Sequence, residues 1–203
     1  GSPVQTDAKA GRFKYADIDG NDTIDTKDRT IIGNPNPKFT YGINLSAQFK
    51  QFDFSMMLYG SQGNDIFNYG SYFLDFVASF QNSKSRDALY NSWSPSNPNA
   101  RLPIAENLST FSTNGVTNSY FIDNGSYLRC KQIQLGYNFL PNILQKAGID
   151  KARLYVQAAN LFTITKYRGL DPELAGGATA FGIDYGGNYP PIKTYIVGIN
   201  ITF

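Results

Sequence analysis

Residues 40–61, TYGINLSAQFKQFDFSMMLYGS, decide the fold class. Apolar residues recur there at every second position, with polar or small residues between them. Side chains of a β-strand alternate between the two faces of a sheet, so this pattern predicts amphipathic strands over residues 40–50 and 52–61. Only Gln51 lies between the two runs, which predicts a tight antiparallel hairpin. The apolar positions are Tyr41, Ile43, Leu45, Ala47 and Phe49, then Phe52, Phe54, Met56 and Leu58.

The same period of two returns in three later segments and predicts strands over residues 126–139, 151–164 and 192–203. The five strands should be consecutive antiparallel neighbours. Their connections are one residue, then about sixty, about eleven and about thirty residues, so short and long alternate, as in outer-membrane barrels with short periplasmic turns and long extracellular loops. With the C-terminus in the periplasm, residues 62–125 and 165–191 become extracellular.

Composition excludes several classes of function. The 203 residues include no histidine and one cysteine, Cys130, which leaves no Ser-His-Asp or Cys-His arrangement, no disulfide and no cysteine metal cluster. The net charge of +2 implies no nucleic-acid partner. Asp171 and Glu173 could in principle hydrolyse glycosides, but nothing places them at a cleft. We therefore expect no enzyme, and interpret these two acids as solvated and Arg129 as a solvated or lumen-facing charge.

The alternative is a soluble β-sandwich, a calcium-stabilised carbohydrate-binding module in which Trp93 and loop tyrosines stack on sugars. Trp93 lies in residues 91–99, whose prolines and asparagines predict a loop, and the simpler interpretation of its ring is packing within that loop. The solvent that faces the apolar side of the strands separates the two hypotheses. Lipid indicates a barrel wall, and a second packed sheet indicates the module.

An acidic run near the N-terminus has the spacing of a calcium loop. Such a loop supplies oxygens from positions 1, 3, 5, 7, 9 and 12, and an apolar residue, here Ile24, commonly stands at position 8. Position 6, usually glycine, is Asp22, and position 12 is an aspartate where glutamate is usual. We predict a structural calcium site whose ligands are Asp17, Asp19, Asn21, Thr23 (through its carbonyl), Asp25 and Asp28.

Seven phrases, in order along the chain, resemble the C-terminal region of the SusC/RagA family of TonB-dependent transporters. They are GRFKYADIDGN at 11–21, DRTIIGNP at 28–35, PKFTYG at 37–42, GSQGNDIFN at 60–68, GSYLR at 125–129, NLFT at 160–163 and YRGLDPE at 167–173.

This resemblance implies an all-β fold, the C-terminal segment of a 22-stranded transmembrane β-barrel with long extracellular loops. It also implies location in the bacterial outer membrane, a SusD-like surface lipoprotein as partner, and TonB-driven import of oligosaccharides or peptides. Residues 1–38 would be an extracellular loop segment with the calcium-type loop, and residues 39–203 the C-terminal barrel strands and loops. Five strands leave two unpaired edges, so the remaining N-terminal barrel and the plug, through which TonB would act, are expected on other sequence.

Overall fold

The computed structural model describes residues 2–79, 83–144, 148–174 and 180–203, which divide into two compact units. The loop unit comprises Gly1–Pro35, Asp65–Asp123 and Leu174–Asn188, and the sheet unit comprises Asn36–Asn64, Asn124–Glu173 and Tyr189–Phe203. Among the described residues, no helix is both long and apolar enough to cross a membrane.

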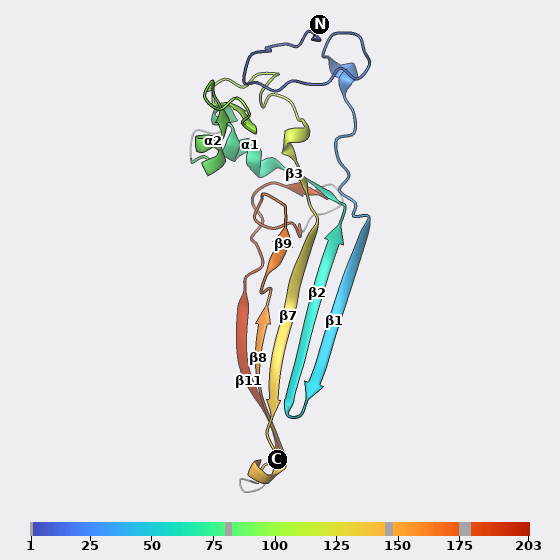
Figure 1. The fold of residues 1–203 in the computed structure, drawn as a ribbon, viewed down its shortest axis with the longest axis vertical. Helices are drawn as coiled ribbons and strands as arrows, with labels where there is room; N and C mark the ends of the chain where they lie inside the picture. The colour runs from blue at the N-terminus through green and yellow to red at the C-terminus, as the bar shows by residue number, and fades with distance from the viewer. Residues whose placement is uncertain (1, 80–82, 145–147, 175–179) are drawn as a thin grey trace. The chain divides into compact units, whose positions relative to one another are not determined.

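The sheet unit is built on one long antiparallel sheet with strand order β1-β2-β7-β8-β11 (Figure 1). These strands are consecutive neighbours in the order predicted, and each pairs antiparallel with the next. Their bounds are Phe39–Phe49 (β1), Phe52–Gln62 (β2), Tyr127–Asn138 (β7), Lys151–Ala159 (β8) and Thr194–Thr202 (β11). The period-two pattern thus identified all five strands.

Two local predictions in this unit were wrong. The single strand over 151–164 ends at Ala159, because Asn160 adopts a left-handed conformation with φ 51°, which asparagine tolerates better than most residues. The chain then forms β9 (Thr163–Thr165), which pairs with β7. The first hairpin turn comprises two residues, with Lys50 at φ 53°, where Gln51 alone was predicted.

Connections of different length leave opposite ends of the sheet. Registers join Phe52 to Tyr137 and Lys151 to Thr202, so the first hairpin turn, the 139–150 connector and the C-terminus share one end. The described part of that connector contains the short helix α3 (Pro141–Leu144); residues 145–147 lie outside the described residues. The long segments 63–126 and 166–193 both leave the other end, as the loop-length pattern predicts.

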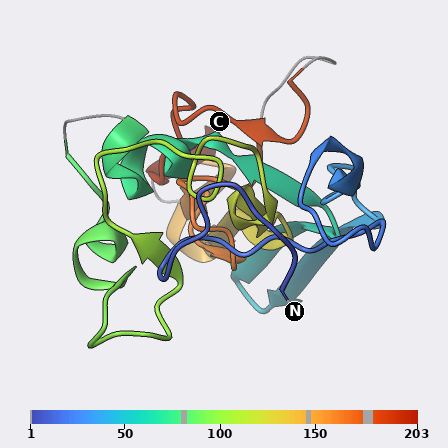
Figure 2. The same ribbon diagram turned by 90° about the horizontal axis from the view of Figure 1, so that it is seen from above.

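The loop unit is made of short helices and strands joined by loops (Figure 2). Its core is aromatic. The core rings include Phe13, Phe76, Tyr120 and Phe121, with ring centroids 5.4–6.1 Å apart. The elements are η1 (Thr26–Asp28), β3 (Asp65–Asn68), α1 (Tyr69–Asp75), η2 (Val77–Ser79), α2 (Arg86–Tyr90), β4 (Ser92–Trp93), β5 (Leu102–Ile104), η3 (Ser119–Phe121), β6 (Ile122–Asn124) and β10 (Ile183–Asp184).

The loop prediction for one segment of this unit was wrong in part. Residues 91–99 are not wholly loop, because β4 pairs in parallel with β5.

Candidate functional site: the two faces of the long sheet and the acidic loop

One face of the long sheet is apolar from edge to edge. The strand registers align its side chains in three neighbouring rows across all five strands, and within these rows Leu135 is 45% and Val197 is 73% exposed. Within the described residues of the sheet unit, no second sheet covers this face. The rows are Leu45–Met56–Ile133–Ala158–Tyr195, Ala47–Phe54–Leu135–Val156–Val197 and Phe49–Phe52–Tyr137–Leu154–Ile199.

Aromatic rings mark both ends of this apolar face. Phe39 and Tyr41 contact each other at one end, with ring centroids 5.9 Å apart. At the other end the Tyr137 ring contacts Phe52 and Phe139 at 5.1 and 5.2 Å. Phe39 and Phe49 are ten residues apart on one strand, about 33 Å at about 3.3 Å per residue, which is about 25 Å along the axis of a barrel whose strands tilt by about 40°. The apolar band of an outer-membrane barrel is about 25 Å tall and bordered by aromatic girdles.

The opposite face of the sheet is polar and carries an ion pair. Arg153 Nε donates to Asp53 Oδ2 at 2.9 Å, and Asn138 Nδ2 donates to the same oxygen at 3.0 Å. These groups meet above Gly136, where a Cβ atom would lie 2.5 Å from both the Arg153 and the Asp53 side chains. Glycine at this position therefore permits an ion pair that spans three strands.

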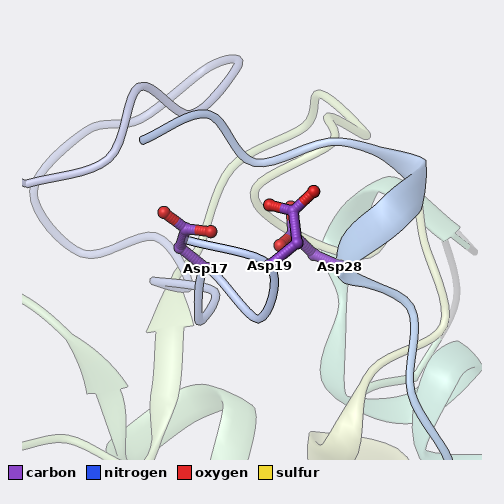
Figure 3. A group of neighbouring side chains, drawn as sticks. All are labelled: Asp17, Asp19 and Asp28. Atoms are coloured by element: carbon purple, nitrogen blue, oxygen red, sulfur yellow. The ribbon is translucent and has the colours of Figure 1, made fainter. Parts of the chain in front are cut away.

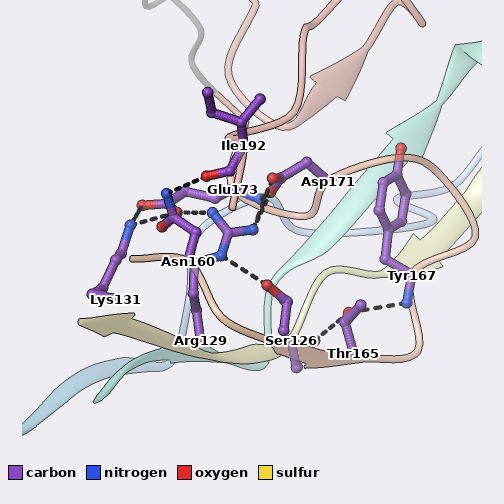
Figure 4. Close-up of polar contacts among 10 residues, drawn as sticks. Ser126, Arg129, Lys131, Asn160, Thr165, Tyr167, Asp171, Glu173 and Ile192 are labelled. Atoms are coloured by element: carbon purple, nitrogen blue, oxygen red, sulfur yellow. Dashed lines mark hydrogen bonds and ion pairs between the residues drawn. The ribbon is translucent and has the colours of Figure 1, made fainter. Parts of the chain in front are cut away.

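A second charged cluster lies at the long-loop end of the polar face (Figure 4). The Arg129 guanidinium donates to both carboxylate oxygens of Asp171, at 2.6 and 2.8 Å, and also pairs with Glu173. Its Nε donates to Thr163 Oγ1 at 2.9 Å. The Arg129 side chain is 3% exposed and that of Asp171 is 8% exposed, so the prediction of a solvated Asp171 was wrong, and of the two interpretations of Arg129 only the lumen-facing one remains. The cluster fixes the loop after β9 to strand β7.

Lys131 completes this cluster because strand β7 is irregular. The register between β2 and β7 shifts beside Lys131, which has no partner in the ladder. An extra residue of this kind re-aims a side chain. Lys131 Nζ lies 2.7 Å from both Glu173 carboxylate oxygens and 5.7 Å from the centroid of the Tyr59 ring. Lys131 therefore reaches the face that carries Arg129, although alternation alone would place it on the other face.

Cys130 and Trp93 occupy packed positions. Cys130 is fully buried within β7, where solvent does not reach its thiol. The Trp93 ring lies against Gly11, where a Cβ atom would be 2.4 Å from the ring. This contact favours the packing interpretation of Trp93 over exposure for sugar stacking.

The structure brings three of the six predicted calcium ligands together. Carboxylate oxygens of Asp17, Asp19 and Asp28 lie within 4.8 Å of one another (Figure 3). The Asp25 side chain instead caps η1, accepting from the Lys27 backbone N–H at 2.6 Å. The side chain of Asn21 likewise bonds within the loop, accepting from the N–H of Thr23 at 2.8 Å. The predicted six-ligand set therefore stays a prediction, with three of its carboxylates close together.

The backbone of this loop has two properties of a calcium loop. Asp22 at position 6 takes φ 61°, the left-handed conformation for which glycine is usual there. Ile24 at position 8 is buried, and its backbone N–H donates to the Val4 carbonyl at 2.9 Å. The backbone N–H groups of Asp25 and Ile18 donate to Asp28 and hold the pKa of its carboxyl below the ordinary value. These hydrogen bonds therefore favour the ionised form of the Asp28 carboxyl.

Comparisons with known proteins cover nearly the whole chain. No family model matches it. It is 37% identical over 204 residues to TonB-dependent receptor P3 of Formosa agariphila, a match of 97% of this chain and 19% of that protein. It is 34% identical over 192 residues to TonB-dependent receptor SusC of Bacteroides thetaiotaomicron, covering 93% of this chain and 17% of that protein. The chain thus spans about a fifth of the length of the curated relatives it matches.

Solved structures similar to this chain include two of the RagAB system. The RagAB peptide transporter matches 90% of this chain and 19% of its own with a TM-score of 0.73 and 27% sequence identity. The RagAB peptide importer in its closed-closed state matches 92% of this chain and 20% of its own with a TM-score of 0.72 and 28% identity.

Proposed function

The chain belongs to the SusC/RagA type of TonB-dependent outer-membrane receptors, and from this premise we propose that it is the C-terminal barrel portion of a nutrient importer. The observation that carries the proposal is the two-faced sheet, whose apolar face would meet lipid and whose polar face would meet the lumen. The apolar face has the height and aromatic borders of a membrane-spanning band. A soluble β-sandwich would need a second sheet against this face.

In the proposed orientation, the short connections face the periplasm and the long segments face the cell exterior. A cysteine at Ser96, in the long segment, should react on whole cells with a maleimide that cannot cross the membrane. A cysteine at Gln51, in the first hairpin turn, should react only after the outer membrane is permeabilised. Cys130 is buried, so it should add little to the labelling background, and the importer without either substitution is the control. Labelling of Gln51→Cys but not of Ser96→Cys on whole cells would overturn the orientation.

We propose that the importer takes up oligosaccharides or peptides with a surface lipoprotein of the SusD type, and that TonB acts through the remainder of the protein. Support comes from SusC and from the RagAB structures, which are described as a peptide importer. The lipoprotein should contact the segments 62–125 and 165–191. Affinity purification of the intact importer should recover it, and deletion of residues 91–99 should weaken its recovery if that loop contributes to the contact.

We also propose that the chain has no catalytic role. Asp171 and Glu173, the acid pair nearest to a glycosidase arrangement in sequence, are both held by the cations Arg129 and Lys131. A glycosidase needs one carboxyl free to donate a proton to the leaving group. An assay of the purified importer with oligosaccharides should therefore detect uptake or binding without cleavage.

A structural calcium ion in the 17–28 loop is a further proposal. Three carboxylates converge there, and a hard cation takes six to eight oxygens. Asp17, Asp19 and Asp28 would be the anchors, with Asn21, Thr23 and Asp25 completing the set after local rotation. Calorimetry with calcium on the intact importer should give binding heat that the Asp17→Ala/Asp19→Ala variant loses. Equal heat from both proteins, or none from the parent, would remove the site.

A further inference from the structure

A cavity of about 370 Å³ lies beside the Arg129 cluster in the sheet unit. Its lining combines β9, the start of the following loop and the segment that leads into β11. Three of the lining residues are Pro172, Pro190 and Pro191, and proline fixes φ. The walls of this cavity are therefore preorganised, which reduces the entropy lost when a solute binds.

The hydrogen-bonding groups around the cavity are mostly donors. Thr163 Oγ1 accepts from Arg129 Nε, which leaves its own hydroxyl proton to donate. Asn160 uses one N–H of its side-chain amide on the Ile192 carbonyl and retains the second (Figure 4). Lys193 adds an ammonium group with three donors. Thr163 and Lys193 are exposed, so a solute can reach them.

The charged groups at the cavity leave one positive charge in excess. Arg129 and Lys131 are matched by Asp171 and Glu173, so these four side chains carry no net charge together. Lys193 forms no ion pair within the described residues of this unit. A donor-rich cavity with one surplus positive charge is complementary to a carboxylate.

We propose that this cavity is a subsite for a carboxylate group of the imported solute, with Lys193 as the charge partner and Thr163 and Asn160 as hydrogen-bond donors. The proposal rests on the assignment of the chain to an importer, because that assignment places the polar face in the path of the solute. Phe162 and Leu170 also line the cavity and would contact the apolar part of the solute next to the carboxylate.

The test is calorimetry on the intact importer in detergent with matched acidic and neutral probes. The probes are N-acetyl-dialanine against its C-terminal amide, and glucuronate against glucose. At least one acid should bind about tenfold more tightly than its neutral partner. The Lys193→Gln variant should lose this preference, Lys193→Arg should keep it, and the matched control Lys151→Gln, which lies at the opposite end of the sheet, should leave it unchanged.

The two probe pairs separate the sources of the carboxylate. Preference for the peptide acid assigns the subsite to peptide C-termini, and preference for glucuronate assigns it to acidic sugars. Equal affinity for acid and neutral probe in both pairs, or no binding of any probe, overturns the proposal. The same holds if Lys193→Gln keeps the full preference. This binding measurement is independent of the surface labelling at Ser96 and Gln51, so failure of the subsite is distinguishable from failure of the importer assignment.

Discussion

Replacement of Ile133 by arginine tests whether the apolar face contacts lipid. Ile133 lies on β7, the central strand of the long sheet, in the row between the aromatic ends of the apolar face. An arginine at the midplane of an outer-membrane barrel costs about 2–4 kcal/mol. This corresponds to a decrease of roughly 30- to 700-fold in the folding equilibrium constant, at about 1.4 kcal/mol for each factor of ten.

Two variants control for the effects of size and of distance from the membrane centre. Gln134 is the next residue but points to the polar face, among Ser55 and Gln157, so Gln134→Arg should change stability by no more than about 0.5 kcal/mol. Leu154 is on the apolar face in the aromatic end row, where Leu154→Arg should cost only about 0–1 kcal/mol. The assay is denaturant unfolding of the intact importer in lipid vesicles. Equal destabilisation by Ile133→Arg and Gln134→Arg, or a larger effect at Leu154 than at Ile133, would refute the lipid-facing assignment.

Three further predictions concern the two units separately. Arg129→Met should lower the free energy of unfolding of the importer by about 3–5 kcal/mol, because it leaves Asp171 buried without its cation. A change below about 1 kcal/mol in denaturant unfolding would show that the cluster does not stabilise the fold. Chelation of calcium should increase amide hydrogen exchange across residues 17–28 in the parent and should have no such effect in the Asp17→Ala/Asp19→Ala variant. Equal exchange with and without chelator in the parent would argue against a bound ion. Burial raises the pKa of Tyr15, whose hydroxyl donates to the Phe111 carbonyl at 2.9 Å. The stability contributed by its neutral phenol is therefore complete below about pH 10 and is lost as pH rises through the higher pKa of the folded state. The difference in phenolate absorbance between the parent and Tyr15→Phe should titrate above about pH 10, and titration at or below that pH would contradict the prediction.

The strands could be predicted from the sequence because their physical cause is local. A strand that separates lipid from water must alternate apolar and polar residues, and that alternation is visible without any tertiary information. The break at Asn160 could not be predicted in this way. Leu161 and Phe162 continue an apolar character beyond β8, and only the left-handed conformation of Asn160 ends the strand.

The acidic loop shows where spacing alone is insufficient. Six positions have the right spacing and oxygen-bearing residues, and among the acidic ones the carboxylates of Asp17, Asp19 and Asp28 lie together. The Asp25 carboxylate is used as a helix cap, a role that its position before Thr26–Asp28 also favours. The Asp25 carboxylate could cap the short helix or bind calcium, and in this structure it caps the helix.

The charged groups of the polar face depend on contacts between residues far apart in the sequence. Arg129 and Asp171 are forty-two residues apart, and Asp53 and Arg153 are one hundred apart, so no local pattern joins them. For Lys131 the local pattern gives the wrong face of the sheet. Strict alternation assigns it to the apolar face, where a charge facing lipid is costly. The irregular register of β7 avoids that cost by turning Lys131 to the polar face, where it neutralises Glu173. A charge at a lipid-facing position of an otherwise regular strand therefore predicts a bulge at that residue, and in this chain the bulge supplies the fourth member of the Arg129 cluster.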